Sequence, residues 1–82
     1  MIELTDRARD ALVMFHAAAA RWNPDVVLRL ARSGAELRPH LVEEPEPGDE
    51  PLAIDALTVY VEPGVEGVVD AGDHNVLTLV PS

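Results

Sequence analysis

The sequence predicts a single α+β domain, in which one N-terminal amphipathic helix packs on a mostly antiparallel β-sheet or sandwich. Three observations lead to this fold class: one early segment has helical periodicity, several later segments alternate with period two, and turn-forming residues separate them. An order of one long helix followed by several strands is typical of α+β folds. Since 82 residues suffice for only one core, we expect residues 1–82 to form one domain.

The predicted helix begins after a short strand over residues 1–4. Thr5 is a good N-cap, and Asp6 lies in the first turn, where the helix dipole favours negative charge. The helix is predicted over residues 6–22 and ends at Asn23-Pro24-Asp25. Its apolar stripe is expected to face the core. The stripe comprises Ala8, Ala11, Leu12, Phe15, Ala19 and Trp22.

The core has few large side chains to draw on. Phe15, Trp22 and Tyr60 are the three aromatic residues of the chain, so Leu, Val and Ala must fill most of the interior. Such a small core leaves little margin of stability without oligomerisation, and we therefore expect a homodimer. With Phe15 on the core stripe, Phe15→Ala is predicted to cost about 3 to 5 kcal/mol.

Two strands are predicted after the helix. Residues 26–31 alternate with period two, and Ser33-Gly34 supplies a turn before a second strand over residues 37–42. Pro39 removes a backbone donor from this second strand. We therefore expect the strand to lie at a sheet edge or to carry a bulge.

A Pro-rich acidic segment follows these strands. Residues 44–51 contain three prolines and four acidic residues, which predicts a solvated loop. Residues 52–55 favour a brief strand, and residues 57–61 are rich in β-branched and aromatic residues, which predicts another strand. The loop is short, so the segments on its two sides are expected to share one fold.

The remaining elements are a helix, a turn and a strand. Pro63 favours a short helix that runs to about residue 69, because proline is well suited to the first helical turn. Residues 70–73 predict a turn, and residues 74–80 a last strand.

Charge is unevenly distributed along the chain. The net charge is −9, and residues 39–82 contain ten acidic residues and no Lys or Arg. This balance opposes binding to nucleic acids and to anionic membrane surfaces. No segment reaches the roughly 20 apolar residues of a membrane span, and Glu3 and Asp6 lie where a signal peptide carries positive charge, so a cytoplasmic location is expected.

Five motifs together resemble the HesB/IscA family, the A-type scaffold or carrier proteins of iron–sulfur cluster assembly. The resemblance covers about residues 1–70 and depends on the order and spacing of the motifs. They are the opening strand, Thr cap and helix start in Met1-Ile2-Glu3-Leu4-Thr5-Asp6-Arg7-Ala8, the Leu-Arg strand in Val27-Leu28-Arg29-Leu30, the turn at Ser33-Gly34, the Pro-x-Pro-Gly-Asp loop in Pro45-Glu46-Pro47-Gly48-Asp49, and the strand Val59-Tyr60-Val61-Glu62-Pro63.

The chain departs from this family at every cluster ligand. Ser33-Gly34-Ala35-Glu36 stands where the family has a Gly-rich turn with its first cysteine, and the family's Cys-x-Cys motif has no counterpart because the chain contains no cysteine. Thiolates are the ligands that hold iron–sulfur clusters. The resemblance therefore implies the fold without cluster binding, and we expect a non-catalytic protein that acts through protein–protein association.

The alternative is a metal-binding protein that uses His and Asp ligands or the cysteines of a partner. His16, His40 and His74 show no His-x-His or i, i+4 spacing. Asp70, Asp73 and His74 lie close enough in sequence to meet a hard cation, but they do not match a calcium loop. We therefore expect no metal site and no cofactor.

An enzyme active site is not expected either. Ser33 is beside a glycine but lacks the Gly-x-Ser-x-Gly pattern of a nucleophile elbow. The carboxylate pairs Glu43-Glu44 and Asp49-Glu50 lie in or beside an exposed loop, with no apolar pocket to shift a pKa. The glycines are scattered and there is no lysine, so no phosphate-binding loop is present.

The edge strand is the candidate partner-binding surface. An edge with unpaired backbone donors can add a strand from a second copy or from another protein. The alternative is that its apolar side chains pack on their own core. We expect Arg29, Arg32 and Arg38 to pair with acidic residues of the same chain, in preference to forming a partner-binding patch. The predicted partner-binding residues are Leu37, Arg38, Pro39 and Leu41.

Overall fold

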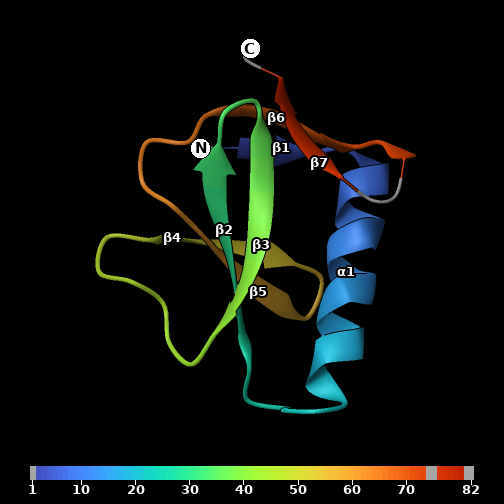
Figure 1. The fold of residues 1–82 in the computed structure, drawn as a ribbon, viewed down its shortest axis with the longest axis vertical. Helices are drawn as coiled ribbons and strands as arrows, with labels where there is room; N and C mark the ends of the chain where they lie inside the picture. Colours follow the sequence, from blue (N-terminus) through green and yellow to red (C-terminus); the bar gives the residue numbers. More distant parts are fainter. Residues whose placement is uncertain (1, 74–75, 81–82) are drawn as a thin grey trace.

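The structure is a computed structural model that describes residues 2–73 and 76–80. It contains one helix and a seven-stranded mixed sheet with the strand order β1-β6-β7-β3-β2-β5-β4 (Figure 1). Four neighbouring pairs of strands are antiparallel and two, β1–β6 and β2–β5, are parallel. The α+β class and the mostly antiparallel sheet are thus confirmed. The elements are β1 (Ile2–Leu4), α1 (Asp6–Ala20), β2 (Val27–Ser33), β3 (Glu36–Val42), β4 (Glu50–Ile54), β5 (Leu57–Val61), β6 (Gly67–Ala71) and β7 (Leu77–Val80).

The helix begins where the sequence predicts. Thr5 is extended, and its side chain accepts the Ala8 N–H, which satisfies one of the free donors of the first turn. The helix ends at Ala20, two residues earlier than predicted, although the N–H groups of Trp22 and Asn23 both still reach the Ala19 carbonyl.

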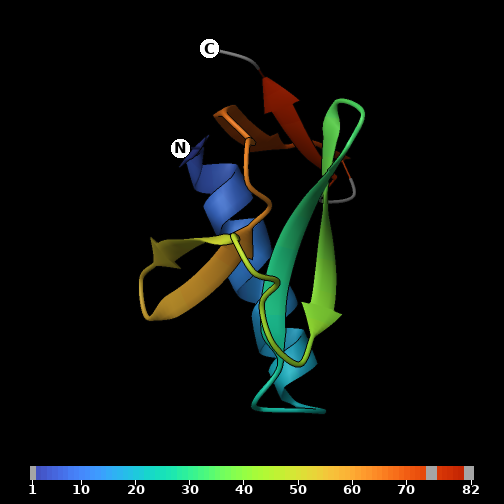
Figure 2. The same cartoon turned by 90° about the vertical axis from the view of Figure 1, so that its left-hand side faces the viewer.

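The sheet curls around the helix. The β2–β3 hairpin stands in the middle of Figure 1, and β1, β6 and β7 gather at the upper end. Figure 2 shows α1 between the β2–β3 hairpin and the β4–β5 hairpin. The core enclosed by this curl is aliphatic, as expected. Its buried residues are Ile2, Ala8, Ala11, Leu12, Leu28, Leu30, Leu37, Ile54, Val59, Val61, Val65, Val69, Ala71, Leu77 and Leu79.

The region after Pro63 differs from the prediction. Residues 67–71 form the strand β6, and no helix starts at Pro63. β6 pairs in parallel with β1 and antiparallel with β7, so pairing with strands distant in sequence overrides the local preference. The predicted turn over residues 70–73 is also wrong in its first half, because Asp70 and Ala71 belong to β6. β7 confirms the last strand over residues 77–80, while the predicted strand residues 74 and 75 lie outside the described residues.

The predicted core stripe of the helix is only partly buried. Ala8, Ala11 and Leu12 are buried, but Phe15 is 38% exposed and Trp22 is 92% exposed. The reason is the limited extent of the sheet on this side: β7 pairs with β3 only at Glu36 and Leu37. The sheet therefore leaves the side of α1 that carries Phe15 uncovered, although His16, Ala19 and Ala20 are partly buried, and Phe15 and Trp22 are not core residues.

Candidate association surface

An apolar groove lies between α1, β3 and β7. Its volume is about 230 Å³. Leu12 and Leu77 are buried at its base, and the exposed Met14 and Phe15 stand on the helix side. The residues that line it are Ala11, Leu12, Met14, Phe15, Pro39 and Leu77. We refer to these six residues as the α1–β3 groove.

The apolar surface continues beyond the groove. Trp22 lies two residues beyond the end of α1 and seven residues after Phe15. Since the Asn23 N–H still reaches the Ala19 carbonyl, the chain keeps its helical course there, which places Trp22 on the side of Phe15 about two turns further on. Leu41 lies on the same face of β3 as Pro39, two residues along the strand, and is 48% exposed. α1 and β3 run in the same direction in Figure 1, so Trp22 and Leu41, which follow the groove residues Phe15 and Pro39 in the chain, both come after the groove toward the same end of the molecule.

The four predicted partner-binding residues divide into three environments. Pro39 lines the groove and Leu41 extends it. Leu37 is only 2% exposed and belongs to the core. Arg38 alternates with Pro39, so it lies on the opposite face of β3, where its guanidinium is 3.9 Å from the Glu36 carboxylate.

Sequence reasoning missed the helix side of this surface. Met14, Phe15 and Trp22 are 67%, 38% and 92% exposed, whereas the helical stripe predicts that Phe15 and Trp22 face the core. The aromatic count points the other way, because a chain with three aromatic residues weakens its core when it leaves two of them exposed, so it did not mark Phe15 and Trp22 as surface residues.

β3 is not an edge strand as predicted, because it lies between β7 and β2 in the sheet, whose edges are β1 and β4. β7 pairs only with Glu36 and Leu37, however, so residues 38–42 are open on that side and offer few backbone groups for strand addition. On the β7 side, the Ala35 carbonyl accepts the Leu79 N–H at 2.9 Å. Successive residues of an antiparallel strand direct their backbone N–H and C=O groups alternately to the two neighbouring strands. In β3 the backbone groups of the odd-numbered residues are therefore directed away from β2. The missing N–H of Pro39 therefore falls on the open edge, which leaves the Leu41 N–H as its free donor over residues 38–42. Proline at such a position protects an edge, and association here must depend on side chains.

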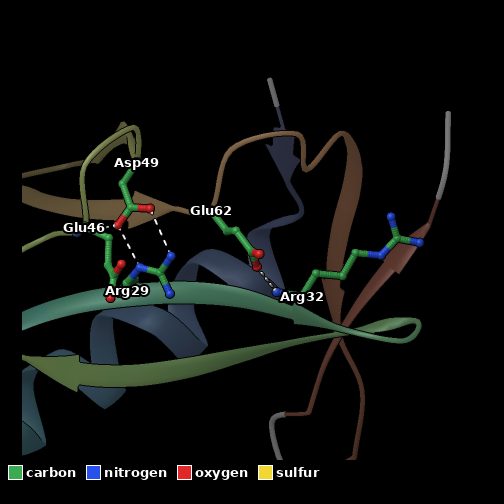
Figure 3. Close-up of polar contacts among 5 residues, drawn as sticks. All are labelled: Arg29, Arg32, Glu46, Asp49 and Glu62. Carbon is green, nitrogen blue, oxygen red and sulfur yellow. Dashed lines mark hydrogen bonds and ion pairs between the residues drawn. The ribbon is translucent and has the colours of Figure 1, made fainter.

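The acidic loop is held to the sheet by one ion pair. The Arg29 guanidinium donates two hydrogen bonds to the Asp49 carboxylate, from Nε at 2.7 Å and from Nη2 at 3.1 Å (Figure 3). The Glu46 N–H also donates to this carboxylate, at 3.0 Å. The hydrogen bond from Arg29 is the main reason that the pKa of Asp49 is lowered. Residues 44–48 of the loop predicted over residues 44–51 are exposed, as predicted, but the Asp49 side chain is only 1% exposed. Glu50 and Pro51 belong to β4, so the loop ends two residues earlier than predicted.

The other two arginines behave differently. The Glu62 carboxylate accepts the backbone N–H of Arg32 at 2.9 Å (Figure 3). The Arg32 Nε donates to the Gly34 carbonyl at 3.0 Å. β5 pairs with β2 only over Leu28 to Leu30, and Glu62 accepts the N–H of Arg32, which lies after this paired stretch. Pairing within the chain is confirmed for Arg29 and for Arg38, whereas Arg32 interacts through its backbone and with a carbonyl.

The residues considered for metal binding are not brought together. His16 is half-buried and lines a second, open pocket beside the β4–β5 turn, and His40 is exposed on β3. The Asp70 carboxylate accepts hydrogen bonds from Thr5 and Ala71. His74 lies outside the described residues. Over residues 2–73 and 76–80, no group of three His, Cys, Asp or Glu side chains has a geometry that could hold a metal ion.

Comparison of the chain with protein-family models, with curated proteins and with solved structures finds no match. The helix in the described residues is neither long nor apolar enough to cross a membrane. The residues themselves therefore carry the functional argument, and the feature that distinguishes them is the α1–β3 groove.

Proposed function

We propose that the chain is a non-catalytic, HesB/IscA-like domain that acts through protein–protein association at the α1–β3 groove. The observation that carries the proposal is the exposure of Trp22, at 92%, next to a groove lined by apolar side chains. A large aromatic side chain in water beside an apolar recess is typical of a binding surface, because aromatic residues contribute strongly to the free energy of association.

The contact between two family-like motifs supports the family part of the proposal. Arg29 belongs to the Leu-Arg strand and Asp49 to the Pro-x-Pro-Gly-Asp loop, and the two residues form the bidentate ion pair of Figure 3. The motifs thus have a structural role that does not involve cluster ligands. A chain can keep such motifs for its fold after it has lost the cysteines.

The proposed role excludes cluster carriage by this chain's own thiolates, because it has no cysteine. The domain instead associates with another protein chain, in the context of iron–sulfur metabolism that the resemblance implies. No catalytic step is assigned to it.

Site-specific photo-crosslinking tests the association. Benzoylphenylalanine replaces Phe15 in the groove in one variant and Glu66, an exposed loop residue between β5 and β6, in the matched control. We expect irradiation of cells that express each variant to give a discrete adduct from position 15 and none from position 66. Absence of an adduct at position 15, or equal adducts at both positions, would contradict the proposal.

Anaerobic incubation with ferrous iron and sulfide tests the lack of a cluster role. We expect the desalted protein to retain no stoichiometric iron and no visible iron–sulfur absorption. Retention of a cluster would contradict the non-ligating role, and loss of that cluster in His16→Ala or His40→Ala would then support the alternative with histidine ligands.

A further inference from the structure

An exposed aromatic side chain and an apolar recess lie along α1 and the turn that directly follows it. Trp22 projects at 92% exposure, and Ala11, eleven residues earlier, lines the groove. α1 ends at Ala20, but the Asn23 N–H still reaches the Ala19 carbonyl, so the chain keeps a helical course as far as Trp22. Eleven residues along such a course make about three turns, which places Trp22 on the same side as Ala11, about 16 Å further along the helix axis. A surface of this kind can be complementary to itself under a two-fold axis.

We infer that the occupant of the α1–β3 groove is a second copy of this chain, packed through antiparallel α1 helices so that Trp22 of each copy enters the groove of the other. The inference rests on the proposed function and names its partner. A two-fold axis near His16 places Trp22 opposite Ala11 of the second copy, because residues 11 and 22 lie at nearly equal distances on either side of it. Each protomer then fills the recess of the other, and the dimer leaves no unfilled copy of this surface for a third chain.

Charge is complementary across the same axis. Asp10 precedes Ala11 and Arg21 precedes Trp22 by one residue, so this second pair is also eleven residues apart. By the same helical geometry, Asp10 and Arg21 lie on one common side. Antiparallel packing brings Arg21 of one copy beside Asp10 of the other, twice. Neither residue forms an ion pair within the part of the chain that the structure describes.

The distribution of charge favours a second copy at this face. Two molecules of net charge −9 repel each other, most strongly through residues 39–82, which hold ten acidic residues and no basic ones. The helix is different: it contributes Arg7 and Arg9 against Asp6 and Asp10, with Arg21 directly after it. Two copies that meet through α1 therefore avoid the repulsion between their acidic halves.

The exposed aromatic area is consistent with a stable contact. Trp22 and Phe15 together offer on the order of 300 Å². This is more than a third of the roughly 800 Å² that each partner contributes to a standard interface. Met14, Pro39 and Leu41 enlarge the same surface.

Sedimentation equilibrium over a range of concentrations tests the inference. We expect the wild-type chain to dimerise and Trp22→Ala to raise the dimer dissociation constant at least tenfold. Asp10→Arg and Arg21→Asp are each expected to raise it at least threefold at low salt, and the double variant with both changes to restore it to within twofold of wild type. Arg9→Asp, which reverses a charge on the opposite side of the same helix, is the matched control and should leave the constant unchanged.

Circular dichroism establishes that each variant is folded before its dissociation constant is compared. A wild-type chain that remains monomeric would overturn the inference, as would a dimer that is insensitive to Trp22→Ala or not restored by the charge exchange. If the chain is monomeric while the position-15 crosslink gives an adduct with a different protein, the second copy is the wrong partner but the proposed function stands. If the crosslink gives no adduct, both fail.

Discussion

The Thr5 hydroxyl donates a hydrogen bond to Asp70 Oδ1 at 2.7 Å, across 65 residues of sequence. The same hydroxyl accepts the Ala8 N–H at 3.2 Å. The N-cap residue of α1 is therefore hydrogen-bonded both to the first turn of the helix and to Asp70 of β6. Asp70 Oδ1 also accepts the Ala71 N–H at 2.9 Å. These bonds, that of Thr5 above all, lower the pKa of Asp70. A residue that starts a helix thus also joins the helix to the sheet.

Replacing Thr5 tests this joint. Thr5→Ala removes the cap and the bond to Asp70, and we expect it to lower the free energy of unfolding by about 1 to 2 kcal/mol. Thr5→Ser keeps the hydroxyl and should remain within about 0.5 kcal/mol of wild type. Urea denaturation followed by circular dichroism measures both, and equal losses in the two variants would contradict the role of the hydroxyl.

Stability is expected to fall in acid. The pKa values of Asp49 and Asp70 are lowered in the folded state from the ordinary value of 3.8, so the unfolded chain binds more protons as the pH falls below about 5. The stabilisation of the fold by these two carboxylates is present at pH values above their ordinary pKa of 3.8 and is lost progressively at lower pH. Asp49→Asn should flatten this dependence in urea titrations between about pH 5 and pH 2. A variant with the wild-type slope would show that Asp49 does not contribute to it.

Breaking the Arg29–Asp49 pair should loosen the acidic loop. We expect Arg29→Ala to cost about 1 to 2 kcal/mol and to speed cleavage after Glu43 by a glutamate-specific protease, since Glu44 and Glu46 each precede a proline and are not cleaved. The control is Arg38→Ala, whose ion pair is exposed and 3.9 Å long and which should change neither quantity measurably. Equal cleavage rates in the two variants would contradict the role of the pair.

Gly67 is required at the start of β6. Its φ is +124°, and a Cβ atom there would lie 2.5 Å from the Val80 carbonyl oxygen. Gly67→Ala is therefore expected to destabilise the fold by about 3 kcal/mol, since backbone strain and the contact with β7 act together. Gly72→Ala, where the added methyl group meets no atom within 4 Å, is the control and should have little effect. Thermal unfolding distinguishes the two variants.

The exposure of Phe15 changes the expected cost of its removal. Measured on the monomer, Phe15→Ala should cost about 1 kcal/mol, well below the 3 to 5 kcal/mol of a core phenylalanine, because the side chain is 38% exposed at the groove. Leu12→Ala, at a site that is 1% exposed, should cost about 2 to 5 kcal/mol. Chemical denaturation of dilute protein checks the order, and a larger loss for Phe15→Ala would mean that it belongs to the core.

The β3 part of the candidate surface could be predicted from the sequence. Pro39 and Leu41 follow from the period-two pattern and from the missing donor of proline, both of which are local properties. Phe15 and Trp22 could not be placed, because helical periodicity identifies an apolar stripe but does not say how far the sheet extends over it.

The sequence by itself determined the helix with its Thr5 cap, the hairpin around Gly34, the strands of alternating pattern and the exposed Pro-rich loop, since these depend on backbone preferences and on side chains a few residues apart. Only the tertiary structure decided that residues 67–71 form a strand, that Asp49 bonds Arg29, and that the side of α1 that carries Phe15 is uncovered. These features arise from strand pairing and sheet curl, which join segments far apart in the chain. Local sequence patterns do not predict which distant segments will pair, because the free energy that favours one pairing over another comes from contacts formed only in the folded molecule.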